Sequence, residues 1–475
     1  MIQKRLPTGE VVEAYPITQA QSIMYYVYNS YGGNTPVLNI GTGYYWQGEI
    51  DVPLFKESLY EAMERCDVFR LRFAPDRQFG LVQYLAEKSE IEVEEVDLSG
   101  MSYDEAYKEM KQWTYKMIDM FYKPLHTVRI IHLENNYHGM YIKFHHLGFD
   151  GYSSKVFLSD VMDIYVSKRT GSAYPKPMKP YLEAVNKELE YLSSPQRDAD
   201  KNYFINLFST EDEPIFNDYL LENRLFKQRR ENNNPNQRFV KMYEGEHPES
   251  RSKYFEVSAD DTAEIMNACK ENGLSIACVL MTALRTTLSA FNANEEDVGH
   301  KFMVNRRGNL LEKKSGGIRM HFFTLRTKIS GEKTFREAVG IVEDAQNEIF
   351  RHSSFHTLEM YHIMHQVRGT GSLDQTYDPM SFSYQPYMEI AAENEEQRKS
   401  SIGVWYNNDV SAQNMYLTVK HRPSDKGFEF IFEYRINENP VKDVEVFFEK
   451  MMAVLKTGSR DPEIKIKDIL EEIKL

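Results

Sequence analysis

The amino-acid sequence predicts a mixed α/β (α+β) protein. Segments with a helical spacing of apolar residues alternate along the chain with segments typical of strands, which is the pattern of α/β and α+β folds. The length of 475 residues is too great for one ordinary hydrophobic core, so two or three folding units are expected. The chain contains no short repeat and no long low-complexity tract.

The first part of the chain carries both kinds of element in alternation. Apolar residues recur at helical spacing in residues 54–66, and residues 68–73 then have the character of a strand. A second amphipathic helix is predicted over residues 103–121.

A β-hairpin followed by a helix is predicted next. Two apolar runs in residues 125–146 flank Glu134-Asn135-Asn136, and such Asn-rich tripeptides favour tight turns. Residues 153–168 then show helical periodicity. The two serines that begin this helix are candidates for its N-cap, and Gly171 is placed to end it.

A boundary between two lobes is expected near residue 185. The stretch GSAYPKPMKP breaks both periodicities with three prolines in a short span. We therefore expect an N-terminal lobe over residues 1–185 and a C-terminal lobe over residues 186–475. Residues 209–252 are dense in charge and asparagine, and they predict an exposed loop excursion.

The C-terminal region repeats the mixture of elements. The stretch AEIMNACKENG predicts a helix that stops at Gly273, and a second helix follows over residues 275–290. Residues 428–434 predict a strand, and residues 441–455 predict a strongly amphipathic final helix.

Composition excludes several classes of function. The net charge of -14 argues against a protein that mainly binds nucleic acid, and it gives no support to docking on anionic membranes. The three cysteines, Cys66, Cys269 and Cys278, form neither a metal motif nor a disulfide framework. The N-terminus lacks the apolar segment of a signal peptide, and no apolar run is long enough to span a membrane. We therefore expect a cytoplasmic monomer.

The chemistry is predicted to lie in the nine residues from His145 to Ser153. Adjacent residues on a strand point to opposite faces, so one imidazole of the pair His145-His146 can enter a cavity while the other packs into the scaffold. Asp150 is well placed to hold the following turn through an ion pair, and an exposed histidine can relay a proton from a nucleophile. A bare pair of histidines before Asp-Gly is more often an ordinary strand-turn-helix, whereas the full string in a hairpin favours a functional site.

The string resembles HHxxxDGxS, the hallmark of the condensation domains of nonribosomal peptide synthetases within the chloramphenicol-acetyltransferase-like superfamily. The resemblance extends to three further stretches, residues 15–21, residues 65–73 (RCDVFRLRF, usually RHExLRTRF) and residues 304–307 (VNRR). The closing strand and helix over residues 428–455 also fit. The resemblance therefore covers nearly the whole chain.

The resemblance implies a V-shaped pseudo-dimer of two similar lobes, with a tunnel between them that admits donor and acceptor from opposite sides. His146 would be the catalytic residue, acting as a base or by positioning the acceptor amine. His145, Asp150 and Ser153 would be structural, and Gly151 would leave room for the thioester arm. Arg306 is our choice for the arginine that pairs with the motif aspartate, with Arg307 as the near alternative.

The fifth motif of the family, near IGxFVNT, departs from the pattern here. Residues 316–324 read GGIRMHFFT, so Arg319 stands where phenylalanine is usual and His321 where asparagine is usual. Since these positions lie near the tunnel in the family, Arg319 and His321 are candidate tunnel residues. The departure is explained equally well by an unusual substrate and by drift within the lineage.

A group of four histidines close together in the sequence raises the question of a metal site. No cysteine or well-spaced carboxylate completes such a site, so packed or solvated histidines are favoured and no metal is expected. The group consists of His352, His356, His362 and His365.

The resemblance implies an acyltransferase that joins a thioester-bound acyl or aminoacyl group to an amine, or less readily a hydroxyl, in nonribosomal peptide or related natural-product biosynthesis. No covalent cofactor is expected, because the substrates are carried on the phosphopantetheine of acyl or peptidyl carrier proteins that act in trans. The chain has no phosphate-binding loop, adenylation signature or carrier attachment site, and it lacks both the DFGWG motif of plant-type acyltransferases and the paired aspartates of heterocyclisation domains. Coenzyme A thioesters as donors, an epimerase and a catalytically silent recruitment domain remain as alternatives.

Overall fold

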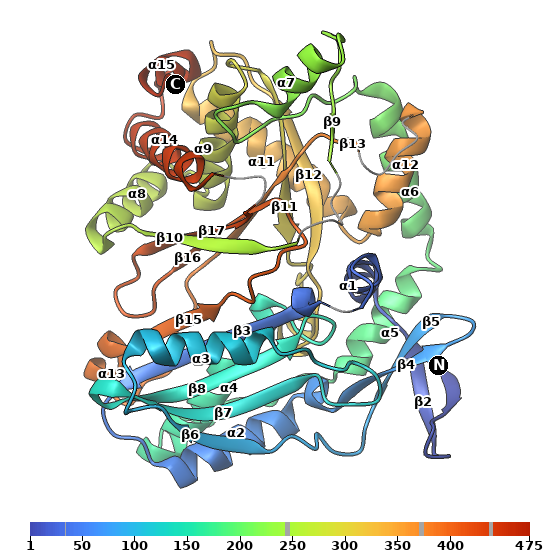
Figure 1. Cartoon of the computed structure of the whole chain (residues 1–475), viewed down its shortest axis with the longest axis vertical. Helices are drawn as coiled ribbons and strands as arrows, with labels where there is room; N and C mark the ends of the chain where they lie inside the picture. Colours follow the sequence, from blue (N-terminus) through green and yellow to red (C-terminus); the bar gives the residue numbers. More distant parts are fainter. Residues whose placement is uncertain (34, 243–247, 370–374, 437–439) are drawn as a thin grey trace.

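Two sheets with their helices form the body of the molecule, one above the other in Figure 1. The computed structural model describes residues 1–33, 35–242, 248–369, 375–436 and 440–475. The mixed α/β fold predicted from the sequence is confirmed, and strands and helices alternate through both halves of the chain.

The lower sheet of Figure 1 carries the hairpin of the nine-residue motif. Its two faces differ because side chains alternate along each strand. Tyr45 and Tyr141 pack against α3 (Tyr103–Tyr115), whereas Trp46 and Ile142 belong to the core shared with α2 (Val52–Arg65) and α4 (Gly151–Thr170). The strand order is β15 (Ile402–Tyr406), β3 (Asn39–Gln47), β8 (Tyr137–His145), β7 (His126–Leu133) and β6 (Val93–Asp97).

The edge strand β15 comes from the C-terminal half of the chain. It pairs antiparallel with β3, from Ile402 opposite Tyr45 to Tyr406 opposite Gly41. The hydroxyls of Tyr45 and Tyr406 are 2.9 Å apart in the core beneath α3. A cut at residue 185 would therefore leave the lower sheet without one of its strands.

The upper sheet contains six strands and packs on the C-terminal helices (Figure 1). Phe428, Phe430 and Phe432 alternate on one face and form the core with α8 (Ala259–Glu271), α9 (Ile276–Phe291) and α14 (Val441–Arg460). The strand order is β10 (Ser250–Glu256), β17 (Phe428–Arg435), β16 (Met415–His421), β14 (Met380–Gln385), β11 (Asp297–Val304) and β12 (His321–Lys328).

Two smaller sheets and the remaining helices complete the structure. One small sheet has the strand order β1 (Ile2–Arg5), β2 (Val11–Pro16), β5 (Gly80–Leu85) and β4 (Leu71–Asp76), and the other pairs β13 (Gln375–Thr376) with β9 (Val240–Lys241). The remaining helices are α1 (Gln19–Ser30), α5 (Tyr181–Tyr191), α6 (Pro195–Thr210), α7 (Arg224–Glu231), α10 (Leu310–Lys314), α11 (Phe335–His352), α12 (Thr357–Arg368), α13 (Glu395–Ser400) and α15 (Ile466–Glu472).

Local details differ from the sequence-based expectations at several element ends. The expected strand at residues 68–73 begins as a 3-10 turn over Asp67–Arg70 and becomes β4 only at Leu71. The helix expected over residues 103–121 ends at Tyr115. The helix α14 is not the final one, because the short helix α15 follows it.

The segment 209–252 is not an exposed excursion throughout. Asn217 and Asp218 are fully buried, and the carboxylate of Asp218 pairs with the guanidinium of Arg224 at 2.6 Å. The side chain of Asn217 also bonds the backbone of β11, accepting from the N–H of Gly299 at 2.7 Å. The polar residues of this segment thus satisfy one another and the sheet, which allows them to be buried. Residues 243–247 of the segment lie outside the described residues.

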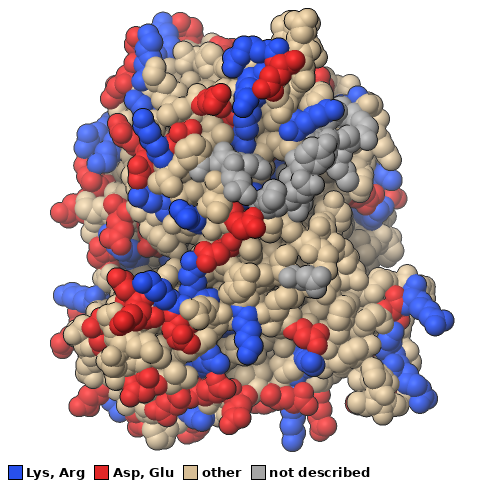
Figure 2. Space-filling model, viewed as in Figure 1, with Lys and Arg blue, Asp and Glu red and all other residues tan. Residues whose placement is uncertain are grey.

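Charged side chains of both signs are interspersed over the face shown in Figure 2, without a continuous basic area. Among the described residues, no single helix has the length and apolar composition to cross a bilayer. The pair α8 and α9 meets those two criteria together, although its members are bent by 108° relative to each other.

Candidate active site

His145 and His146 occupy the end of β8, where the chain leaves the lower sheet. His145 is the last residue of the strand and lies opposite Asn39 on β3, while the backbone N–H of His146 donates to the carbonyl of Leu38 at 2.7 Å. The His145 side chain is buried, and its Nδ1 accepts from the N–H of Leu147 at 3.2 Å. Burial lowers the pKa of His145 to about 3, so this imidazole is a neutral part of the scaffold.

The imidazole of His146 faces a cavity with one nitrogen left for chemistry. Its Nδ1 lies 2.8 Å from the carbonyl oxygen of Phe149. A carbonyl only accepts hydrogen bonds, so Nδ1 carries the proton and Nε2 keeps its lone pair. Burial lowers the pKa of His146 below its ordinary value, which keeps the ring neutral at neutral pH. The ring can therefore accept a proton from a nucleophile.

Asp150 is the N-cap of α4 and the centre of a buried ionic network. One carboxylate oxygen accepts from the N–H of Ser153, and the other accepts from the N–H of Arg319, each at 2.9 Å. The guanidinium of Arg307 lies 2.9 Å from the same carboxylate. Burial alone would raise the pKa of Asp150, but Arg307 and the two N–H donors hold it below its ordinary value. The serines expected to cap α4 are thus replaced in that role by Asp150.

The arginine that pairs with the motif aspartate is Arg307, and our choice of Arg306 is wrong. Arg306 adopts a positive φ of 50°, and the guanidiniums of these neighbouring residues reach different partners. Nη1 of Arg306 lies 2.7 Å from Nε2 of His321, whereas Nη2 of Arg307 donates to Asp150, Ser153 and Gly317. Two adjacent arginines in a loop have no periodicity from which sequence alone could distinguish them.

Ser153 and Gly151 complete the motif on α4. The buried hydroxyl of Ser153 donates to the carbonyl of Gly317 at 2.5 Å and accepts from Arg307 at 2.7 Å, which ties α4 to the loop before β12. Gly151 lines the same cavity as His146. A Cβ at Gly151 would lie 3.6 Å from Nε2 of Gln385, an ordinary contact, so the protein side of the cavity does not itself demand glycine.

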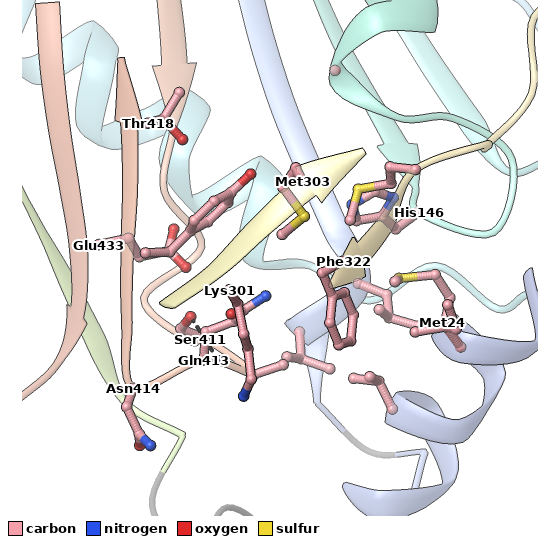
Figure 3. A pocket seen from close by; sticks show the side chains of 18 of the residues that line it. Met24, His146, Lys301, Met303, Phe322, Ser411, Gln413, Asn414, Thr418 and Glu433 are labelled. Carbon is pink, nitrogen blue, oxygen red and sulfur yellow. Dashed lines mark hydrogen bonds between the residues drawn. The ribbon is translucent and has the colours of Figure 1, made fainter. Parts of the chain in front are cut away.

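The cavity that contains His146 lies between the two sheets and has a volume of about 370 Å³. It receives side chains from α1, α12 and the strands β11, β12, β16 and β17. In Figure 3 the side chains of Met303, Phe322 and Met24 lie on the side of His146, and those of Glu433 and Thr418 lie on the opposite side. The lining thus combines an apolar part with a set of polar and charged side chains.

The two expected tunnel residues do not line this cavity. Met320 and Phe322 line it instead. His321 begins β12, so the alternation along the strand turns it away from the face of Phe322, and Arg319 lies in the loop before the strand. His321 is fully buried between the guanidinium of Arg306 and the hydroxyl of Thr357, which lies 3.2 Å from its Nδ1. Burial lowers the pKa of His321 well below its ordinary value.

Three of the four clustered histidines have identified surroundings within the protein. His352 stacks on Tyr203 with 3.8 Å between ring centroids, and its Nδ1 lies 2.9 Å from Asp200. His356 caps α12 and contacts the hydroxyl of Ser22 at 2.5 Å, while His365 lines the cavity. Within the part of the chain that the structure describes, no three metal-ligating side chains come together.

Sequence reasoning missed the polar residues of the cavity that come from the upper sheet. Lys301 lies on β11, on the same face as the apolar Met303, and Glu433 lies on β17. The strand predicted over residues 428–434 places Glu433 on the face opposite its three phenylalanines, and this was the signal that could have identified it.

Comparison with known proteins identifies the family. The model of the condensation domain matches residues 11–472. The chain belongs to the condensation-domain family. Surfactin synthase subunit 1 of Bacillus subtilis (strain 168) is 23% identical over 467 residues, which cover 96% of this chain and 12% of that protein. Tyrocidine synthase 2 of Brevibacillus parabrevis is 22% identical over 331 residues, covering 67% of this chain and 8% of that protein.

Solved condensation domains share the fold. The first condensation domain of the calcium-dependent antibiotic synthetase, in complex with a substrate analogue, superposes with a TM-score of 0.77 at 18% identity, covering 96% of this chain and 98% of that one. A mutant starter condensation domain of rhizomide synthetase, in complex with C8-CoA and Leu-SNAC, gives 0.76 at 15% identity, covering 95% and 96%. The predicted condensation-domain fold is therefore confirmed.

Proposed function

We propose that this condensation domain is an acyltransferase that joins a thioester-bound acyl or aminoacyl group to an amine, with His146 as the catalytic residue. The observation that carries this proposal is the neutral imidazole of His146, which lines the cavity. Its Nδ1 bonds the carbonyl of Phe149, and its Nε2 takes no part in that hydrogen bond. A neutral acceptor that lines a cavity can take up the proton of an attacking amine.

The chemical step follows from this geometry. The amine nitrogen attacks the thioester carbonyl carbon, so a C–N bond forms and the C–S bond breaks. The amine proton passes to Nε2 of His146 and then to the leaving thiolate, which restores the neutral ring. An amine is already nucleophilic, so holding it at the carbonyl supplies much of the acceleration.

The buried network around Asp150 supports this role by fixing the loop that carries His146. The carbonyl of Phe149, which sets the tautomer of His146, belongs to the residue immediately before Asp150. The ion pair of Asp150 with Arg307 holds Asp150 to the loop that follows β11 of the upper sheet. Phe149 thus sets the tautomer of His146, and the next residue, Asp150, makes the contact with Arg307.

The donor is proposed to be carried by phosphopantetheine, either on a carrier protein acting in trans or as coenzyme A. The family supports the first source, and the rhizomide neighbour, which was solved with C8-CoA and Leu-SNAC, supports the second. The chain covers about an eighth or less of the two synthetases described above, so their activities do not transfer as a whole.

Intact-mass spectrometry of the donors tests this function. Acyl-loaded carrier proteins and acyl-coenzyme A are each incubated with the protein and a mixed pool of amines. We expect one donor class to discharge into an amide with the wild-type protein. Binding of carrier proteins without discharge of any donor would contradict the proposal and favour a silent recruitment domain.

A further inference from the structure

The charged residues that line the cavity are unequally neutralised. Lys420 on β16 lies opposite Glu429 on β17, and their charged groups are 2.7 Å apart. The ammonium of Lys301 lies 4.0 Å from the carboxylate of Asp378. Each cation that lines the cavity thus has an anion at ion-pair distance.

Glu433 is the exception on the same face of the same strand. Its partner across the ladder is Tyr416 on β16, where Glu429 has Lys420. Among the described residues, no cationic side chain lies within ion-pair distance of Glu433. Its carboxylate accepts from Nδ2 of Asn407 at 3.2 Å and is close to the Ser411 hydroxyl.

The surroundings of Glu433 make an unpaired charge costly there. Burial raises the pKa of Glu433 above its ordinary value, which expresses the loss of hydration of its charged form. A neutral amide and a hydroxyl compensate only part of that loss, whereas a cation would supply a charge-assisted hydrogen bond. Figure 3 shows the Glu433 side chain directed into the cavity, across from His146.

We propose that Glu433 binds a cationic group of the substrate, so that the protein selects an acyl or aminoacyl chain bearing an ammonium or guanidinium. This inference rests on the proposed function, because it names the substrate class of that same site. The reacting carbonyl lies at His146, and the cationic end of the chain reaches across the apolar side chains of Met303 and Phe322 to Glu433. An alkyl chain of equal length would fill the apolar part and leave the carboxylate unpaired.

The test is equilibrium binding by titration calorimetry, with pantetheine conjugates in which an amide replaces the thioester. Nα-acetyl-lysyl and Nα-acetyl-norleucyl conjugates differ at the end of the side chain, where norleucine lacks the ammonium. We expect the lysyl conjugate to bind at least about tenfold more tightly, as one charge-assisted hydrogen bond predicts. Glu433→Gln should abolish this preference, whereas Glu396→Gln, an equal charge change at an exposed position on α13, should preserve it.

Each outcome of the titrations either supports or overturns the proposed role of Glu433. Equal affinity of the wild-type protein for both conjugates, no binding of either, or a preference retained in Glu433→Gln would overturn the proposal. Binding of the norleucyl conjugate by Glu433→Gln at least as tight as by the wild-type protein shows that the variant is folded. If that variant does not fold, the wild-type protein is titrated instead with a third ligand, the Nα-acetyl-glutamyl conjugate. The wild-type protein must bind this anionic conjugate more weakly than the lysyl and norleucyl conjugates. The assay needs no turnover, so a Glu433-dependent preference without amide formation would support this inference and contradict the proposed function.

Discussion

Replacing Arg307 with alanine should destabilise the protein far more than the same change at Arg306. The Nη2 of Arg307 donates to Asp150, Ser153 and Gly317 inside the protein, and both partners of the ion pair are almost fully buried. Removing one partner of a buried pair costs about 3–5 kcal/mol. Asp150 keeps two backbone N–H donors in the variant, so we expect the lower end, about 3 kcal/mol. Arg306→Ala loses one hydrogen bond to a neutral histidine, about 1 kcal/mol.

Urea unfolding followed by circular dichroism measures both variants against the wild-type protein. The midpoint should fall clearly for Arg307→Ala and slightly for Arg306→Ala, with an unchanged slope. An equal or larger loss for Arg306→Ala would refute the assignment of Arg307 as the partner of Asp150. A loss below about 1 kcal/mol for Arg307→Ala would show that the buried pair contributes little.

Three further outcomes follow from buried groups and backbone conformation. Acid should destabilise the protein because three histidines, His126, His145 and His300, are buried. Burial lowers the pKa of each to about 3 in the folded state, against 6.5 in the unfolded state. As the pH falls below 6.5, the unfolded state therefore takes up protons first. Each contributes a loss of about 2 kcal/mol between about pH 7 and pH 5, and a flat stability across this range in denaturant titrations would contradict it. With the acceptor amine saturating in its unprotonated form at each pH, activity should persist at pH 6.5 and decline only at lower pH, as the lowered pKa of His146 requires, and a pH-rate profile that still falls above pH 6.5 would count against a neutral base. Gly317→Ala should lose about 1–3 kcal/mol, because φ is +80° and the new Cβ would lie 2.4 Å from Tyr181, whereas Gly340→Ala inside α11, with open space around it, should gain up to about 1 kcal/mol in thermal unfolding.

The sequence predicts the elements whose patterns are local. The hairpin around Glu134–Asn136, the end of α4 at Gly171 and the stop at Gly273 all follow from periodicity and turn chemistry, and the structure confirms them. The pairing of β15 with β3 joins distant parts of the chain, from Ile402 with Tyr45 to Tyr406 with Gly41, and no local pattern encodes it. The burial of Asn217 and Asp218 escaped prediction for the same reason, since these side chains find their partners only in the folded chain.

The residues of the site also include some that the sequence predicts and some that it does not. Strand alternation predicted that one histidine of the pair is buried, and the family resemblance assigned that place to His145, while the turn into the helix that begins at Gly151 indicated the ion pair of Asp150. The choice between Arg306 and Arg307 depends on the backbone of a loop, which the sequence does not specify. For Arg319 and His321, the fifth-motif comparison identified a strand near the cavity but not the face that enters it.

In the proposed reaction Nε2 of His146 takes the proton of the attacking amine. The most direct measurement is the single-turnover rate of amide formation with His146→Ala, compared with the wild-type protein at saturating donor. We predict a loss of about 10²–10⁴-fold in the rate of discharge, with donor binding unchanged, as expected for removal of a general base. A His146→Ala protein that forms the amide at the wild-type rate would contradict the account.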